Sequence, residues 1–343
     1  MDPGTHALAS LALARGFFPR RSWSFILAVV LAGTLADLDL LSLLFGPGAY
    51  LSGRNTLTHS LLGTVVVIAI AASCAFWLRG KNGASPKAGP TSASEFRGIL
   101  LATFVAAILH LAMDLATSSG IAIFWPFRRA RFAWDFLPST DPWILALLVT
   151  GILLPELFAL VGSEIGAKDK APRGRNGALV ALALIVIYVG ARITIHGNAA
   201  AQLDAHSYHG ESPRRVAALP DSLSLFTWHG IVETTSQICT MDVPASSATR
   251  FDPEAAACVH KPEPSPSLTA AQQAEATQQF LVAARFPKAS VGSMESGSQM
   301  VVRDMRDTAE GNTSYALAAR VLLDPAEQIT SQHIVWARDV HLR

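Results

Sequence analysis

His110 and Asp114 are four residues apart in an otherwise apolar segment, AAILHLAMDLAT, at residues 106–117. On a helix, this spacing places both side chains on one face, one turn apart. An imidazole and a carboxylate are costly to bury in an apolar helix, so residues of this kind usually have a function. Taken alone, the pair is explained equally well by a hydrogen bond within the helix.

Four more ionisable residues stand in or beside apolar segments of the first half of the chain. His6 lies in the apolar N-terminal segment, Asp37 and Asp39 interrupt the first long apolar run, and His59 opens the second. Each of them, taken alone, is most simply a polar side chain satisfied inside a helix bundle or at a membrane interface. Six such residues in register instead favour a common site.

Helical rise places these residues at one depth. At ~1.5 Å per residue, Asp37 lies about 21 Å along its span from the basic end, and Asp114 and His59 each lie about 27 Å along theirs. That level is near the outer edge of a hydrocarbon core ~30 Å thick. An N-terminal half-helix that runs inward from His6 brings this residue to a similar depth.

Three imidazoles and three carboxylates suit a divalent transition metal, zinc or manganese first, better than calcium or magnesium, which prefer oxygen ligands alone. We therefore predict a metal site formed by His6, Asp37, Asp39, His59, His110 and Asp114. A metal in such a site lowers the pKa of bound water and polarises a carbonyl or phosphoryl group, so hydrolysis is the expected reaction.

Asp37 and Asp39 cannot both face one site from a regular helix, because two residues turn the side chain by about 200°. Either the helix ends there, or the two carboxylates serve different ions, or one of them supports a ligand from behind. Asp39 is the first candidate for a general base. Asp141, in a later loop, is a second candidate, as a base or a further ligand.

The composition is that of a membrane protein. Half of the 343 residues are hydrophobic and 15% are charged, against about 25% charged in a soluble domain. Lys and Arg number 27 and Asp and Glu 26, and the resulting net charge of +1 argues against a nucleic-acid-binding surface.

The apolar runs predict an all-α polytopic membrane domain over residues 1–196, with an N-terminal half-helix at residues 4–18 and about five transmembrane helices. The expected spans cover residues 22–45, 57–78, 94–117, 143–162 and 177–195. Prolines and alternating polar residues then predict a small soluble α+β domain over residues 197–343. Its expected elements are strands at 225–242, 299–304 and 315–323 and a helix at 269–285.

Basic residues in the loops predict the orientation. On one side of an alternating topology lie Arg15, Arg20, Arg21, Arg79, Lys81, Lys87, Arg97, Lys168, Lys170, Arg173 and Arg175, and on the other lie Arg54, Arg128, Arg129 and Arg131. We expect the last three to contact lipid headgroups. The richer side is expected to be cytoplasmic, which places the C-terminal domain outside. Cys239 and Cys258, the only cysteines of that domain, are then expected to form a disulfide.

The same residues resemble the motifs of the YdjM-type family of bacterial inner-membrane proteins, which are described as metal-dependent hydrolases. The matches to G-x-H, P-D-x-D, H-x-x-x-D, W-P-F and D-P-[FW] are residues 4–6, 36–39 (with alanine for the proline), 110–114, 125–127 and 141–143. The resemblance covers most of the chain and is strongest over residues 1–143. It implies a metal-dependent hydrolase in the bacterial inner membrane.

One motif departs from the family pattern. H-R-G-x-T-H-S reads here as residues 54–60, so Arg54 stands for the first histidine and Asn55 for the arginine. If that histidine is a ligand or an acid–base group in relatives, this chain lacks it. Arg54 and Arg192 are candidates to bind an anionic group of the substrate.

We therefore expect an integral inner-membrane hydrolase that acts through a metal-activated water on a lipid-like or membrane-delivered substrate, with membrane lipids as partners. One alternative is a transporter or proton-relay protein, because buried acids and histidines also mark ion pathways. Another is a non-catalytic membrane scaffold whose outer domain binds a partner. The polar residues stop at one level instead of crossing the membrane, which argues against transport.

Overall fold

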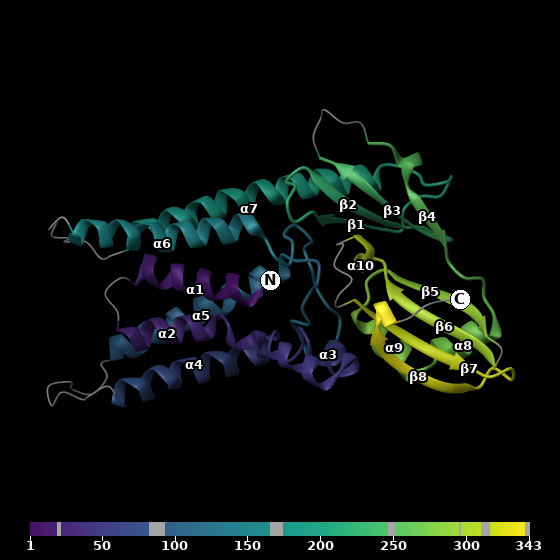
Figure 1. The fold of residues 1–343 in the computed structure, drawn as a ribbon, viewed down its shortest axis with the longest axis horizontal. Coiled ribbons are helices and arrows are strands. Elements are labelled where there is room, and N and C mark those ends of the chain that lie inside the picture. Colours follow the sequence, from purple (N-terminus) through teal and green to yellow (C-terminus); the bar gives the residue numbers. More distant parts are fainter. Residues whose placement is uncertain are drawn as a thin grey trace. The chain divides into compact units, whose positions relative to one another are not determined.

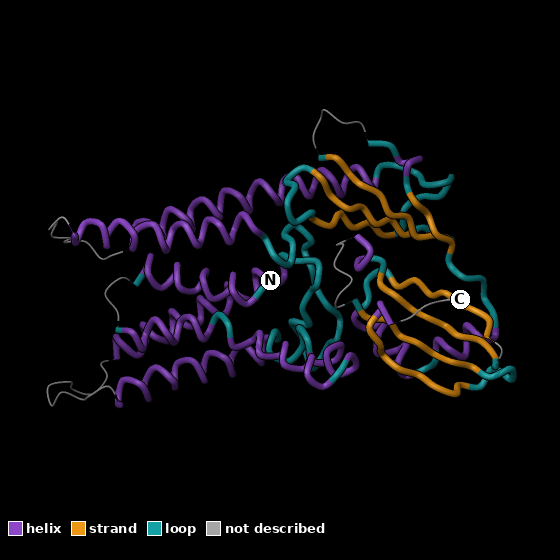
Figure 2. The backbone as a smooth tube through the Cα atoms, in the orientation of Figure 1, coloured by secondary structure: helices purple, strands orange, loops and turns teal. Residues whose placement is uncertain are grey.

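The computed structural model describes residues 1–18, 22–81, 93–164, 174–245, 251–294, 296–309 and 316–339. The first half of the chain is helical, and all the strands named below follow it (Figure 1, Figure 2). Contacts divide the chain into two compact units: Met1–Leu38, Leu57–Phe127 and Phe132–Arg192 form the first, and Asp39–Thr56, Arg128–Arg131 and Ile193–Arg343 form the second. The expected division into domains 1–196 and 197–343 stays a prediction.

Helices form where the apolar runs begin with a capping residue. Asp2 accepts a hydrogen bond from the backbone N–H of Thr5, and Pro3 is the first residue of the helix that follows. Ser22 caps the next helix at Phe25. The elements are α1 (Pro3–Phe17), α2 (Trp23–Ala32), the 3-10 helix η1 (Leu35–Phe45), α3 (Pro47–Gly53), α4 (Leu61–Lys81), α5 (Ala93–Leu115), α6 (Pro142–Glu164) and α7 (Arg175–Asp204).

Three helices of the described chain are long and apolar enough to cross a membrane, over Leu61–Leu78, Ser94–Leu115 and Arg175–Asp204. The run expected as one span at residues 22–45 is a pair, α2 and η1, bent by 53°, and it makes a fourth span only if the pair crosses as one. In α6 the stretch Pro142–Phe158 forms a shorter apolar helix. The prediction of about five spans was too high, and apolar composition does not reveal the bend between α2 and η1.

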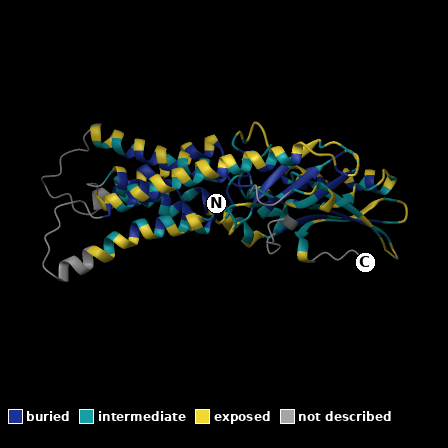
Figure 3. Cartoon of the chain, turned by 90° about the horizontal axis from the view of Figure 1, so that it is seen from above, coloured by how far each residue is buried: buried dark blue, intermediate teal, exposed yellow. Residues whose placement is uncertain are grey.

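The outer faces of the long helices are apolar and exposed, as the alternation of buried and exposed residues along them shows (Figure 3). On α4, Val65, Val66, Ile70 and Trp77 have exposed fractions of 64%, 56%, 52% and 59%. A soluble protein seldom exposes so large an apolar surface. These faces are suited to contact lipid tails.

Alanines bring the helices of the first unit together. Ala28, Ala71, Ala102 and Ala106 are at most 1% exposed and share one core cluster with Phe25. Small residues allow close approach of helix backbones, which stabilises helix pairs in lipid, where the hydrophobic effect between helices is absent.

Two glycines form a similar contact between α6 and α7. A Cβ atom on Gly177 would lie 2.4 Å from the carbonyl oxygen of Gly151 and 2.4 Å from Cγ of Pro155. Only a residue without a side chain fits there, so this pair sets how closely the two helices approach.

The last part of the chain forms an all-β domain of two antiparallel sheets, with strand orders β1-β2-β3-β4 and β5-β6-β7-β8. The strands are β1 (Arg215–Pro220), β2 (Thr227–Glu233), β3 (Gln237–Pro244), β4 (Ala257–His260), β5 (Pro287–Met294), β6 (Gly297–Asp304), β7 (Leu317–Leu323) and β8 (Ile329–Trp336). The α+β prediction was wrong. The expected strand at 225–242 is a β2–β3 hairpin, and the expected helix at 269–285 is two short helices, α8 (Pro266–Gln272) and α9 (Glu275–Ala283).

Cys239 and Cys258 form a disulfide, which confirms that prediction. The two cysteines are direct partners in the register of β3 and β4. The disulfide therefore joins the short edge strand β4 to its neighbour β3.

One face of the second sheet packs against α8, α9 and α3. Met300 and Phe280 belong to this core, and so does Leu51 of α3. The ring of Tyr50, also in α3, lies 6.0 Å from the ring of Trp336. The segment between η1 and α4 is therefore built into the core of the β domain.

We expect Gly177→Ala to lower the stability of the solubilised protein, because the new methyl group would force α6 and α7 apart. Overpacking of this kind typically costs about 1–3 kcal/mol. Gly190 on the same helix is the matched control, because its Cβ would meet nothing within 4 Å and alanine is the better helix former by roughly 0.5–1 kcal/mol. Thermal unfolding followed by circular dichroism measures both variants. Equal unfolding midpoints for Gly177→Ala and Gly190→Ala would contradict the close contact between α6 and α7 at Gly177.

Candidate metal centre

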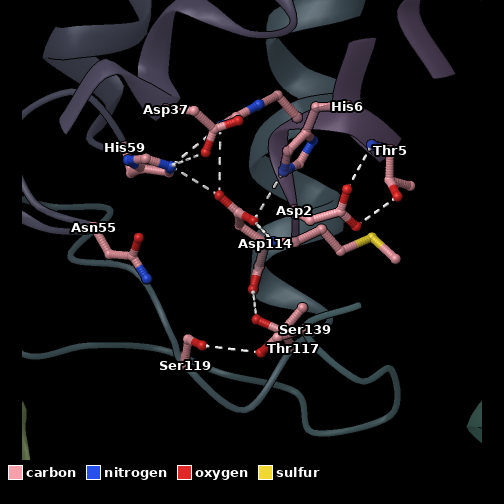
Figure 4. A network of polar contacts seen from close by, with 12 residues as sticks. Asp2, Thr5, His6, Asp37, Asn55, His59, Asp114, Thr117, Ser119 and Ser139 are labelled. Carbon is pink, nitrogen blue, oxygen red and sulfur yellow. Dashed lines mark hydrogen bonds and ion pairs between the residues drawn. The ribbon is translucent and has the colours of Figure 1, made fainter. Parts of the chain in front are cut away.

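Five buried ionisable side chains converge in the first unit. His6 comes from α1, Asp37 from η1, His59 from the turn before α4, and His110 and Asp114 from the end of α5. Figure 4 shows His6, Asp37 and His59 around Asp114. The exposed fractions of the five residues lie between 0% and 6%. We refer to these five residues as the His/Asp cluster.

Asp114 is the centre of the cluster. Its Oδ1 lies 3.1 Å from Nε2 of His6. Its Oδ2 lies 2.8 Å from Nε2 of His59 and 3.4 Å from Nε2 of His110. The amino group of Met1 also contacts Oδ1. One carboxylate therefore collects partners from three separate segments of the chain.

Asp37 completes the group. Its Oδ1 lies 3.9 Å from Nε2 of His59. Four potential ligand atoms lie within 4.8 Å of one another, one each from His6, Asp37, His110 and Asp114. The Nε2 atoms of His59 and His110 are 3.1 Å apart, so His59 lies against the same group.

The tautomer of His110 follows from its backbone contact. Its Nδ1 lies 2.9 Å from the carbonyl oxygen of Gly33, which can only accept a hydrogen bond. Nδ1 therefore carries the proton, and the lone pair of Nε2 faces the cluster. Nδ1 of His59 lies 3.0 Å from the hydroxyl of Thr58, which leaves its Nε2 facing the cluster as well. Metal-binding histidines are commonly oriented in this way through the other ring nitrogen.

The bend between α2 and η1 positions both Gly33 and Asp37. Gly33 is the C-cap of α2, and a Cβ atom there would lie 1.8 Å from the hydroxyl oxygen of Ser10 in α1. The missing side chain lets α1 approach the point where the helix breaks. Broken backbone at membrane depth is tolerated where it is buried in protein or lines a site.

Asp39 lies outside the cluster. Its Oδ1 accepts a hydrogen bond from Nη1 of Arg54 at 2.5 Å, and its Oδ2 accepts one from the backbone N–H of Asn55 at 2.7 Å. The structure thus brings five of the six predicted ligands together. The sixth, Asp39, forms an ion pair with Arg54. The expectation that Asp37 and Asp39 cannot share a face agrees with this placement.

Asp141 and Arg192 have structural contacts. Oδ1 of Asp141 accepts hydrogen bonds from the backbone N–H groups of Trp143 and Ile144, both at 3.0 Å, and so caps α6. Its Oδ2 accepts a hydrogen bond from the hydroxyl of Tyr188 at 2.8 Å. Arg192 is 1% exposed and donates from Nε to the carbonyl of Phe136 at 3.1 Å. The roles predicted for Asp141 in catalysis and for Arg192 in substrate binding stay predictions.

Arg131 contacts protein in this structure. Its Nη2 donates to the carbonyl oxygens of Leu51 and Arg54, each at 3.0 Å, at the C-terminal end of α3. A cation there satisfies carbonyls that the helix leaves open. Burial, followed by the proximity of Arg306, lowers the pKa of Arg131 to about 10.

The carbonyl of Gly33 is the functional group that the sequence did not reveal. A backbone acceptor carries no side-chain signal. A glycine between two apolar helices, four residues before an aspartate, is the one indication that the chain offers.

We expect a transition metal to co-purify with the protein, and we expect His110→Ala and Asp114→Ala to lose most of it, because each variant removes a donor atom of the group. His206→Ala is the matched histidine control, since His206 is exposed and lies in the second unit. Arg54→Gln should keep its metal, because Arg54 binds Asp39. Elemental analysis of purified protein measures the ratio of metal to chain. Wild-type metal content in both cluster variants would rule the site out.

Comparisons with known proteins place the cluster in a family context. A family model described as YdjM inner membrane protein matches residues 1–199. The matched region contains all five residues of the His/Asp cluster. Comparison with curated proteins and comparison with solved structures give no match.

Proposed function

Because the chain belongs to the YdjM family of inner membrane proteins, we propose that it is an integral membrane hydrolase whose His/Asp cluster holds one divalent transition metal ion. The observation that carries this proposal is the spacing of the donors of His6, Asp37, His110 and Asp114, all within 4.8 Å. Two ligands of one ion are at most about 4.4 Å apart. The four donors are thus close to the separation that one ion requires.

The donor set of the cluster supports a divalent transition metal ion. Asp37 and Asp114 offer carboxylate oxygens, and the tautomer of His110 leaves a neutral nitrogen lone pair toward them. Mixed nitrogen and oxygen donors suit zinc or manganese. When bound, the ion would polarise a carbonyl or phosphoryl group and activate water for hydrolysis.

We assign the proton transfer to His59. It is the member of the cluster outside the four-residue ligand group, and its Nε2 faces Asp114 and His110. Its other nitrogen is held by Thr58. Because Nε2 of His110 carries the lone pair, the contact between the two rings requires Nε2 of His59 to carry the proton. A histidine fixed in this way is suited to donate that proton to the leaving group, while a water acidified by the ion would release its own proton to solvent. The carboxylates of Asp39 and Asp141 are engaged by other partners.

The place of the cluster along the helices supports a lipid-like or membrane-delivered substrate. His110 and Asp114 lie at the end of the span Ser94–Leu115, and His59 lies just before the span Leu61–Leu78. His59 and His110 touch, so both spans end at the cluster. A reactive bond held there belongs to a molecule whose apolar part can stay in the hydrocarbon.

A proton relay has less support. Residues 99–109 of α5 contain no ionisable side chain, so the polar groups of this helix do not continue along the span. A relay across the membrane needs a chain of such groups. The cluster is better suited to chemistry at one membrane face.

His59→Gln separates metal binding from catalysis. We expect this variant to keep its bound metal and to lose at least about 100-fold in hydrolysis, the usual contribution of general acid–base catalysis. His110→Ala should lose both. A panel of ester and phosphoester lipids in mixed micelles, assayed by released acid or phosphate, measures the activity. Metal loss in His59→Gln would make His59 a ligand instead, and wild-type turnover in that variant would exclude the assigned role.

We propose that the β domain lies outside the cytoplasm. The disulfide between Cys239 and Cys258 supports this orientation, because such bonds persist in oxidising compartments. The asymmetry of basic residues in the loops points the same way. Reporter fusions after Lys81 and after Lys261 should give a cytoplasmic and an external signal, respectively. A cytoplasmic signal at Lys261 would contradict the orientation and leave the metal site unaffected.

A further inference from the structure

One face of the sheet β5–β8 is lined by cationic and hydrogen-bond-donating side chains. The helices α3, α8 and α9 pack on the opposite face, where Met300 and Val302 point. We define the cationic face by Lys288, Gln299, Arg303, Arg320 and His333. The strand register places all five on one side of the sheet.

Three cations, Lys288, Arg303 and Arg320, and the imidazole of His333 form a row that crosses every strand of the sheet. Lys288 on β5 is the direct partner of Arg303 on β6, and Arg320 on β7 is the direct partner of His333 on β8. Arg320 is opposite Val301, so Arg303 and Arg320 are diagonal neighbours. With strands ~4.8 Å apart, the row is about 14 Å long.

No carboxylate within the sheet balances this row. Strands β5 to β8 contain one acidic residue, Asp304. Asp304 lies on the opposite face of the sheet, with Met300 and Val302. Its Oδ2 lies 2.8 Å from Nη2 of Arg306. A polyanionic ligand along the row would therefore meet no repelling carboxylate of these strands.

Unsatisfied donors stand beside the row. Gln299 is 5% exposed, and in the described part of the chain its Nε2 has no acceptor. Nε of Arg320 is also buried without an acceptor there, while its Nη2 donates to Oε1 of Gln299 at 3.4 Å. A buried donor without a partner is costly. Two such donors next to three cations and an imidazole indicate a binding surface for an acceptor-rich ligand.

We propose that the cationic face binds a linear ligand that carries several phosphate groups. Arginine presents a fork of donors that matches phosphate oxygens, and lysine adds a point charge. Val301 and Ala318, between these side chains, are 1% and 0% exposed, and Val335 and Ala337 pack against them. Ala337 thus covers part of this face, and the strip that remains suits a narrow chain better than a flat bilayer. The direct pairs of the row lie ~5 Å apart and its diagonal pair, Arg303 and Arg320, ~7–8 Å apart, so a linear ligand matches the length of the row.

Isothermal titration of the full-length protein in nanodiscs with short-chain inorganic polyphosphate tests this proposal. We expect saturable binding that weakens as salt is raised, because the contacts are charged. Arg320→Gln should weaken binding about tenfold, the effect of losing one charge-assisted hydrogen bond. Arg320→Lys should weaken it less, which keeps the test valid if Arg320→Gln folds poorly. Arg215→Gln is the matched control, because Arg215 is an exposed arginine of the other sheet, paired with Glu233.

Three outcomes would overturn the proposal. Polyphosphate binding that is absent, or equally weakened by Arg215→Gln, would remove the assigned site. Tighter binding of polyglutamate than of polyphosphate would identify an acidic polypeptide as the ligand. Binding to phosphatidylglycerol vesicles without binding to polyphosphate would identify the membrane surface. Metal content and hydrolysis by the His/Asp cluster are independent of each result.

Discussion

A buried carboxylate among apolar helices is the constraint on which the first unit depends. Asp114 is 2% exposed, and a charge in that setting is costly unless other groups offset it. The groups that do so arrive from α1 and from the turn before α4, as His6 and His59. Satisfying one side chain therefore fixes how several segments meet, and the bend after Gly33 lets a further carboxylate and a backbone carbonyl join them.

The sequence was informative where polar residues interrupt apolar runs. His6, Asp37, His59, His110 and Asp114 could be grouped in advance because each is an expensive exception in its segment. Asp39 could not be separated from Asp37 by composition, since its partner Arg54 is identified only by the path of the intervening loop. Membership of the YdjM family was also predictable, because it depends on the same motifs.

The β domain was harder to predict for a physical reason. Strands such as β5, PKASVGSM, and β8, ITSQHIVW, have one exposed or cationic face, and their apolar positions are few. Their stability comes from partners along the sheet and from α8 and α9, which no local pattern displays. The expected single strand at 225–242 is in fact two strands. β2 ends at Glu233 and β3 begins at Gln237, and composition does not reveal the turn between them.

The place of Leu51 in the β core has a consequence for the order in which the protein is made. Leu51 packs in one cluster with Leu317 and Leu323 of β7, which leave the ribosome long after it does. The loop that carries Asp39 and Arg54 must therefore wait, with its apolar side chains uncovered, until nearly the whole chain has been synthesised. Contacts between such distant residues form slowly, and exposed intermediates are the species that chaperones and proteases recognise. The helices can therefore form before the segment between η1 and α4 is packed. A chain truncated before β7 would still form its helices, but this segment would lack its packing partners.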